Sequence, residues 1–221
     1  MFAWFKWEAL FRNFDVFLEG LWVTVSVSLT ALVATLAISL VVGLARTSGS
    51  RRSSRIAGAY MSFFQNTPLV VQVLFLYNAL PRIGIMLSSF AVGSIGLALY
   101  TGAFGGAVVE AAIRAVPKGQ TEAALSQGFS HLQSMVMVII PQAMRIALPP
   151  MANQLVNLIK NSSIMAMVAG GDLMYRSDSW ASGNLYYGPS FIVTGLLYLA
   201  LCLPLSLIVA RFERMQKGGV A

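Results

Sequence analysis

The stretch LWVTVSVSLTALVATLAISLVVGLA, residues 21–45, carries no charged side chain and is followed directly by Arg46. About 20 consecutive apolar residues are enough for a helix to cross the hydrocarbon core of a bilayer. A signal peptide would be followed by a small-residue cleavage site, but here Arg51 and Arg52 come next. The stretch therefore predicts a retained membrane-spanning helix.

The composition extends this interpretation to the whole chain. Of the 221 residues, 57% are hydrophobic and only 10% are charged, unlike the balance of a water-soluble domain. Further apolar stretches of spanning length lie at residues 56–80, 90–116, 144–159 and 191–209. Pro141, Pro149 and Pro150 interrupt the region around the fourth span, so we expect a segment along the membrane surface before it. The predicted fold class is an all-α integral membrane protein of about five transmembrane helices, forming a single domain over residues 1–221.

The basic residues of the chain indicate its orientation in the membrane. The formal net charge is +7, but the Lys and Arg residues fall between apolar stretches and not on one face, which argues against nucleic acid as a partner. The larger group of basic residues follows the first, third and fifth spans, where the positive-inside rule places the cytoplasm. We therefore expect the amino terminus outside, the carboxyl terminus in the cytoplasm, and membrane lipid around the spans.

The most informative polar segment is VPKGQTEAALSQGFSHLQSMVMVIIPQA, residues 116–143, between the third and fourth spans. We expect a short helix over residues 120–128, capped by Thr121 and ended by Gly128 in the left-handed conformation. The alanines at its centre have small side chains, which allow another protein to approach the backbone closely. An isolated helix this short is marginal in water and favours a docking surface, although a capped loop helix without a partner fits the same residues.

The same segment resembles a family signature. Glu122-Ala123-Ala124, Gly128, Val138 and Ile140-Pro141 match the EAA-x3-G-x9-I-x-LP pattern of binding-protein-dependent ABC importer permeases, with Val138 and Ile140 as mild replacements. The resemblance implies a type I ABC importer permease fold. It also implies that residues 120–128 form a cytoplasmic coupling helix. The residues assigned to coupling with the ATPase are Glu122, Ala123, Ala124, Gly128 and Pro141.

Two more segments resemble the polar amino-acid subfamily of these permeases: FFQNTPLVVQVLFLYNALP at residues 63–81 and VNLIKNSSIM at residues 156–165. The resemblance implies an importer of the bacterial inner (cytoplasmic) membrane for polar amino acids such as glutamate, aspartate or glutamine. Its implied partners are a cytoplasmic ABC ATPase dimer, a second permease subunit (a copy or a paralogue) and an extracytoplasmic amino-acid-binding protein. No GxxxxGK[ST] phosphate loop occurs, so we expect no cofactor in this chain and ATP with Mg²⁺ on the partner ATPase.

Polar residues beside or within apolar stretches are candidates for the substrate pathway, because polar groups are costly to place in a membrane. The candidates form two groups: Gln65, Asn66 and Thr67 in the second span, and Lys160, Asn161 and Ser162 after the fourth. The first group precedes Pro68 and can instead satisfy backbone carbonyls at a kink, while the second can instead form a plain external loop. Members of the resembled subfamily carry Asp where this chain has Asn161, and the neutral amide favours acidic or neutral amino acids.

Other functions fit the sequence less well. A membrane enzyme needs clustered acids, His or Cys, but the chain has one His and one Cys, so we expect no catalytic residue and no metal site. The alternative that we retain is an ion channel or another membrane transporter without an ATPase. GSIGLALYTGAFGG, residues 93–106, is glycine-rich, but we interpret its small residues as sites of close helix packing. Glu110 and Arg114 have the spacing of an i,i+4 ion pair, although an intramembrane acid is also a functional candidate.

Overall fold

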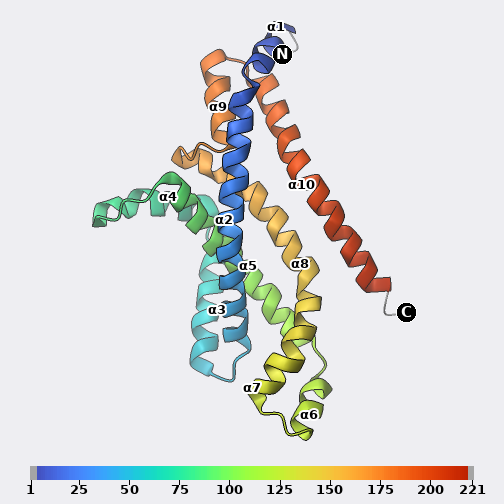
Figure 1. The fold of residues 1–221 in the computed structure, drawn as a ribbon. Coiled ribbons are helices and arrows are strands. Elements are labelled where there is room, and N and C mark those ends of the chain that lie inside the picture. Colours follow the sequence, from blue (N-terminus) through green and yellow to red (C-terminus); the bar gives the residue numbers. More distant parts are fainter. Residues whose placement is uncertain (1–3, 219–221) are drawn as a thin grey trace. The chain divides into compact units, whose positions relative to one another are not determined.

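All regular elements are helices within residues 4–218, which the computed structural model describes, with side chains to residue 214 (Figure 1). The helices in this range that are long and apolar enough to cross a bilayer are α2 (Phe14–Thr47), α5 (Ser89–Ala115), the helical stretch His131–Val168 and most of α10 (Tyr187–Gly218). Their length and composition confirm the predicted class of an all-α integral membrane protein.

Shorter helices complete the chain. They are α1 (Trp4–Arg12), α3 (Arg51–Asn66), α4 (Leu69–Ala79), the 3₁₀ turn η1 (Pro81–Ile83), α6 (Lys118–Ser126), α7 (His131–Ser134), the π-helical turn η2 (Met135–Ile139), α8 (Ile140–Asn161), the 3₁₀ helix η3 (Ser162–Val168) and α9 (Leu173–Asn184). The number of these helices that span the membrane stays a prediction.

The prediction that the second span is one continuous helix over residues 56–80 is wrong. α3 ends at Asn66 and α4 begins at Leu69, because Pro68 lacks an N–H group and adopts an extended conformation, with φ −60° and ψ 134°. The apolar part of this region is the shorter stretch Leu69–Ile83. The proline therefore separates a helix that begins with arginines from a helix that is apolar.

The fourth span, predicted at residues 144–159, belongs to a longer helical stretch. α7 continues through the wider turn η2 into α8, and Pro149 and Pro150 lie inside α8 instead of ending it. No break therefore separates the fourth span from the segment expected along the membrane surface before it, and the position of that segment at the surface stays a prediction. A helix tolerates internal prolines where neighbouring groups satisfy the backbone carbonyls that the prolines free.

The described residues form two compact units, each built from three separate stretches of the chain. Unit 1 contains residues 4–34, 67–98 and 155–208, and unit 2 contains residues 35–66, 99–154 and 209–218. The core of unit 1 has one cluster around Phe17 and Leu173 and another around Val27 and Met165. Because the two units alternate along the sequence, neither is a separate sequence domain, and the single permease domain stays a prediction.

Small residues bring helices into close contact within unit 2. A Cβ atom added to Gly105 of α5 would lie 2.0 Å from Ser39 Oγ of α2, and one added to Gly43 would lie 2.4 Å from Val109 Cγ1. In unit 1, a Cβ on Gly96 would lie 2.7 Å from Val73 Cγ2. These contacts confirm that the small residues of α5 serve close helix packing.

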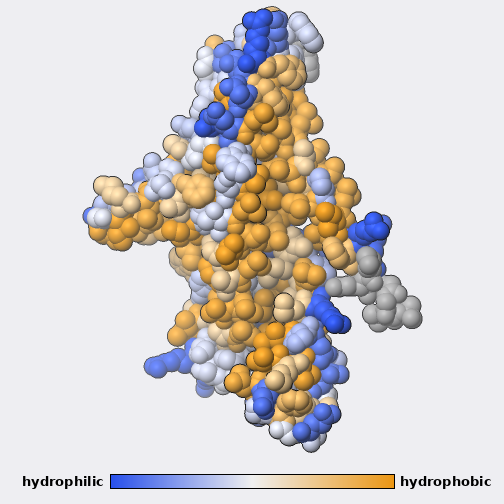
Figure 2. All heavy atoms as spheres, viewed as in Figure 1, coloured by the Kyte–Doolittle hydropathy of each residue, from blue (hydrophilic) through white to orange (hydrophobic). Residues whose placement is uncertain are grey.

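Apolar side chains cover much of the surface of the long helices, as the orange areas of Figure 2 show. Val33, Val41, Leu196 and Leu207 are among the large side chains that are exposed on α2 and α10. Exposed apolar side chains at this density are expected where the surrounding medium is lipid.

Candidate functional site

The short helix α6 starts earlier than the sequence predicts. Its N-cap is Pro117 and its first residue is Lys118, so Thr121 lies inside the helix and caps nothing. Proline at this point ends α5 and has no N–H group that α6 needs to satisfy. The expected cap at Thr121 is therefore wrong, while Pro117 separates the two helices as predicted.

The carboxyl end of α6 agrees with the prediction. Gly128 has a φ of +87° and follows the C-cap residue Gln127. Its N–H group donates to Leu125 O at 3.0 Å, and the N–H group of Phe129 donates to Ala124 O at 3.1 Å. These two bonds form a Schellman motif, which requires a left-handed residue at the position of Gly128.

The residues of the EAA pattern divide between the surface and the interior of unit 2. Glu122 and Ala123 are exposed, whereas Ala124 is buried. Pro141 is exposed in the first turn of α8. Next to it, the Gln142 amide donates to Gln120 Oε1 at 3.2 Å, which links α8 to α6. The two ends of the predicted coupling segment are therefore joined in space.

A capping box lies between α6 and α7, and our reading of the sequence missed it. The Ser130 hydroxyl accepts a hydrogen bond from Gln133 N, and the Gln133 side chain accepts one from Ser130 N. The pattern Ser-x-x-Gln at residues 130–133 was the available signal. The box fixes the direction in which the chain leaves α6.

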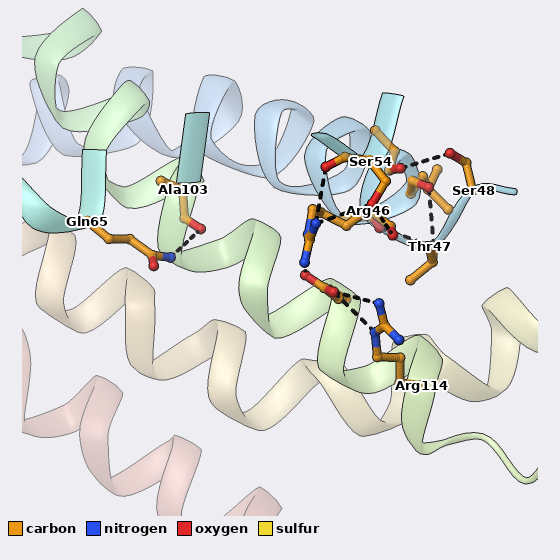
Figure 3. A network of polar contacts seen from close by, with 11 residues as sticks. Arg46, Thr47, Ser48, Ser54, Gln65, Ala103 and Arg114 are labelled. Carbon is orange, nitrogen blue, oxygen red and sulfur yellow. Dashed lines mark hydrogen bonds and ion pairs between the residues drawn. The ribbon is translucent and has the colours of Figure 1, made fainter. Parts of the chain in front are cut away.

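Two side chains of the first predicted pathway group donate to backbone carbonyls, and the third residue accepts a bond through its own carbonyl. Gln65 Nε2 donates to Ala103 O at 3.0 Å, which ties the end of α3 to α5 (Figure 3). Asn66 Nδ2 donates to Ser62 O at 2.7 Å. Thr67 O accepts from Gln72 Nε2 at 2.9 Å across the break at Pro68. The bond to Thr67 O satisfies a carbonyl beside the break, whereas Gln65 binds a carbonyl of α5. Both the interpretation as groups that satisfy the backbone at a kink and the pathway role stay predictions.

The second predicted pathway group lies where α8 becomes η3. Ser162 is fully buried and its hydroxyl donates to Ile159 O at 2.7 Å, whereas Lys160 is exposed and Asn161 is half-buried. The chain stays helical after Asn161, and η3 packs against α4 through contacts around Val168 and Val73. The alternative of a plain external loop is therefore wrong.

A hollow of about 270 Å³ opens beside this group in unit 1, and we call it the Lys160 hollow. Lys160 and Ser163 line it from the α8–η3 segment, and Thr194 and Tyr198 line it from α10. Asn161 and Ser162 do not line it. The Lys160 hollow combines one cation and several hydroxyl groups with apolar walls, which suits a small zwitterion.

Asp172 is a buried acid that our reading of the sequence missed. It is the N-cap of α9, and its carboxylate accepts from Met174 N at 3.1 Å and from Tyr175 N at 3.3 Å. Burial raises its pKa to about 6, although these backbone bonds act in the opposite direction. The local signal was an Asp before a helical stretch, but its burial depends on packing against distant segments such as Thr24, whose hydroxyl accepts from Leu173 N.

Glu110 forms ion pairs with two arginines, shown with the neighbouring polar groups in Figure 3. The expected pair with Arg114 is present at 2.9 Å. The second pair joins Glu110 Oε2 to Arg46 Nε of α2 at 2.9 Å. Arg46 Nη1 also donates to Ser54 O of α3 at 3.1 Å, so the network joins three helices of unit 2. Within the described residues, no group of three or more His, Cys, Asp or Glu side chains is placed to hold a metal ion.

Comparison with known proteins gives consistent matches over nearly the whole chain. Residues 35–217 match the family described as binding-protein-dependent transport system inner membrane component. The probable glutamine ABC transporter permease protein GlnM of Bacillus subtilis (strain 168) is 39% identical over 210 residues, covering 95% of this chain and 97% of that protein. The glutamine transport system permease protein GlnP of Escherichia coli (strain K12) is 30% identical over 215 residues, covering 96% and 98%.

A solved structure has the same fold. It is described as the crystal structure of an amino acid ABC transporter with histidines, and it superposes on this chain with a TM-score of 0.87 at 30% sequence identity. The match covers 95% of this chain and 98% of that chain.

Proposed function

Because this chain belongs to the family of binding-protein-dependent transport system inner membrane components, we propose that it moves a polar amino acid across the membrane when a separate ATPase hydrolyses ATP. The chain is the permease component of an amino-acid ABC importer, with glutamine permeases among its relatives. It is a membrane transport component of the type I permease fold and not an enzyme. This membership argues against an ion channel and against a transporter without an ATPase.

In this proposal α6 is the coupling helix. Glu122 and Ala123 are exposed on it and offer a small-sided surface to a partner, while the buried Ala124 holds the helix to its own chain. The Schellman motif at Gly128 ends α6 sharply, and exposed Pro141 lies in the first turn of α8, the helix that carries movement onward. The link between Gln120 and Gln142 supports a direct mechanical path from α6 to α8.

The partners follow from the same proposal. A cytoplasmic ATPase dimer holds ATP and Mg²⁺, and each α6 docks on it from the cytoplasmic side. A second permease subunit, identical or paralogous, completes the pathway, and an extracytoplasmic binding protein delivers the amino acid. The chain is a component of the inner membrane, and we propose that its amino terminus is outside and its carboxyl terminus in the cytoplasm.

The substrate that we propose is a neutral polar amino acid of the glutamine type. The ammonium group of Lys160, which lines the Lys160 hollow, attracts the α-carboxylate that all amino acids share. Neutral Asn161, beside it in the chain, neither attracts a cationic side chain nor repels a neutral amide. The relatives described above are named for glutamine and none of them for glutamate or aspartate, so the acidic substrates in our expectation receive no support.

The decisive test is reconstitution of the chain with its ATPase and its binding protein in liposomes. We expect glutamine to stimulate ATP hydrolysis more than glutamate, aspartate or arginine does. Lys160→Gln should reduce glutamine-stimulated hydrolysis and uptake, whereas Arg82→Gln, an exposed cation in η1, should not. Stable assembly with stimulation by another amino acid would overturn the substrate proposal only. Failure to bind any ABC ATPase would overturn the proposed coupling.

A further inference from the structure

We propose that a basic hollow at the carboxyl ends of α2 and α5 binds the phosphate headgroup of an anionic membrane lipid. This hollow of about 600 Å³, which we call the Arg46 hollow, lies within unit 2. Its walls include the four arginines Arg46, Arg51, Arg55 and Arg114, together with Thr47 at the end of α2 and Ser48-Gly49 in the turn that follows. The site is independent of the coupling helix and of the Lys160 hollow.

The charges around the Arg46 hollow are unbalanced. Glu110 is the acid that pairs with Arg46 and Arg114, so one carboxylate faces four lining arginines and an excess of three positive charges remains. Arg51 and Arg55 are exposed, and within residues 4–214 the structure gives their side chains no hydrogen bond or ion pair. The single negative charge of a lipid phosphodiester would neutralise part of this excess.

Arginine is the side chain best suited to a phosphate. Its planar guanidinium group donates two parallel N–H bonds to phosphate oxygens. The hydroxyl groups of Thr47 and Ser48 already donate to the α2 carbonyls of Gly43 and Ala45. Recognition in the Arg46 hollow therefore falls to the guanidinium groups, of which Arg46 is held in place by Glu110 and Ser54 (Figure 3).

The position of the hollow favours a lipid over a soluble anion. It lies where two apolar helices end, and the ends of helices that cross a bilayer are expected at the level of the headgroups. The exposed face of α3 carries Arg52 and Arg55 at its start and Ile56 and Phe63 farther along, with Ile56 66% and Phe63 60% exposed. A lipid bound by its phosphate at the arginines can lay its acyl chains on this apolar continuation. Basic pockets between membrane helices are a known form of anionic lipid site.

The leaflet follows from the proposed function. The Arg46 hollow and α6 lie at the same end of unit 2, since Arg114 precedes the first residue of α6 by four positions. If α6 is the coupling helix, the bound lipid belongs to the cytoplasmic leaflet. The phosphate site itself does not depend on that assignment.

The test measures lipid retention by the full chain, without an ATPase, so that it stands apart from the coupling proposal. The chain is reconstituted in nanodiscs with equal amounts of phosphatidylglycerol and phosphatidylcholine, extracted in mild detergent and examined by native mass spectrometry. We expect retained phosphatidylglycerol, and about tenfold less of it in the double variant Arg51→Gln/Arg55→Gln. Arg51→Lys/Arg55→Lys should restore part of the retention, because it restores the charge but not the paired N–H donors of the guanidinium group.

The control is Arg211→Gln/Arg214→Gln, which removes the same charge from exposed positions on α10 that do not line the hollow. This variant should retain phosphatidylglycerol like the unmodified chain. Equal loss in both Gln variants, or equal retention of both lipids, would overturn the site. Displacement of the lipid by inorganic phosphate at low millimolar concentration would overturn the assignment to a lipid in favour of a soluble anion. Far-UV circular dichroism verifies that every variant is folded.

Discussion

Arg46 of α2 donates from Nε to Oε2 of Glu110 on α5 at 2.9 Å, near the carboxyl ends of both helices. The Glu110 side chain is 13% exposed and that of Arg46 is 30% exposed, so water screens their attraction only in part. The other oxygen of Glu110 faces Arg114, whose side chain is 62% exposed. Glu110 therefore pairs with one arginine that is partly buried and with another that is exposed to solvent.

This difference predicts unequal losses of stability. Arg46→Gln should lower the free energy of unfolding by about 2 kcal/mol, because it leaves a sparsely solvated carboxylate without its inter-helix partner. Arg114→Gln should lower it by less than about 0.5 kcal/mol, as is typical of an exposed i,i+4 pair. Thermal unfolding in detergent, followed by tryptophan fluorescence, measures both variants. Equal losses would show that Arg46 and Glu110 do not form the stronger pair.

Close packing of α2 on α5 predicts a cost for a single added methyl group. Gly105→Ala places a Cβ atom 2.0 Å from Ser39 Oγ and 2.9 Å from Ser39 Cβ, so rotation of the hydroxyl alone does not relieve the contact, and we expect a loss of about 1–3 kcal/mol. Gly195→Ala on α10 meets no atom within 4 Å and should be neutral or slightly stabilising. Thermal unfolding of the two variants under the same conditions gives the comparison. A neutral Gly105→Ala would contradict the close approach of these helices.

The left-handed conformation of Gly128 predicts a defect in coupling. Gly128→Trp should weaken co-purification with the ATPase and reduce ATP-driven uptake, because the large residue disfavours a positive φ and stands where α6 would dock. Gly119→Ala lies in the same helix without a positive φ and should retain both properties. Normal assembly and transport by Gly128→Trp would exclude α6 as the coupling helix.

Asp172 predicts a dependence of stability on pH. Its pKa of about 6 in the folded state lies above the ordinary value of 3.8, so the folded state binds the proton more tightly than the unfolded state does. Stability should therefore fall as the pH rises from about 4 to about 6 and stay level above that, by at most about 3 kcal/mol.

Asp172→Asn keeps an oxygen for the cap of α9 and should remove this slope. Thermal unfolding midpoints measured from pH 4 to pH 8 provide the comparison with the unmodified chain. Asp178→Asn, an exposed position on α9, should keep the slope. An unchanged slope in Asp172→Asn would assign the dependence to another group.

Replacing Asn161 with an acid should change the substrate preference. Asn161→Asp adds a negative charge next to Lys160, and we expect the ratio of arginine uptake to glutamine uptake to rise about tenfold. Asn157→Asp adds the same charge at an exposed position one turn earlier on α8 and should leave the ratio unchanged. Uptake of both radiolabelled amino acids into proteoliposomes measures the ratio. If both variants changed it equally, Asn161 would have no special place in the pathway.

Features that depend on nearby residues were predictable from the sequence. Spanning helices follow from runs of apolar residues, because backbone groups inside a membrane must be satisfied within the helix. The left-handed end of α6 follows from Gly128, and the bond between Glu110 and Arg114 follows from their spacing on one helix. The family signature around Glu122 gave the functional class, which the relatives support.

Only the tertiary structure decided the features that depend on distant segments. Pro68 separates two helices, whereas Pro149 and Pro150 lie inside α8, because the outcome depends on whether neighbouring groups satisfy the carbonyls that a proline frees. The bond from Arg46 to Glu110 joins residues 64 positions apart, and no local pattern specifies that distance. The sequence determined which segments enter the membrane through their hydrophobicity, and packing between helices determined which of their polar groups meet.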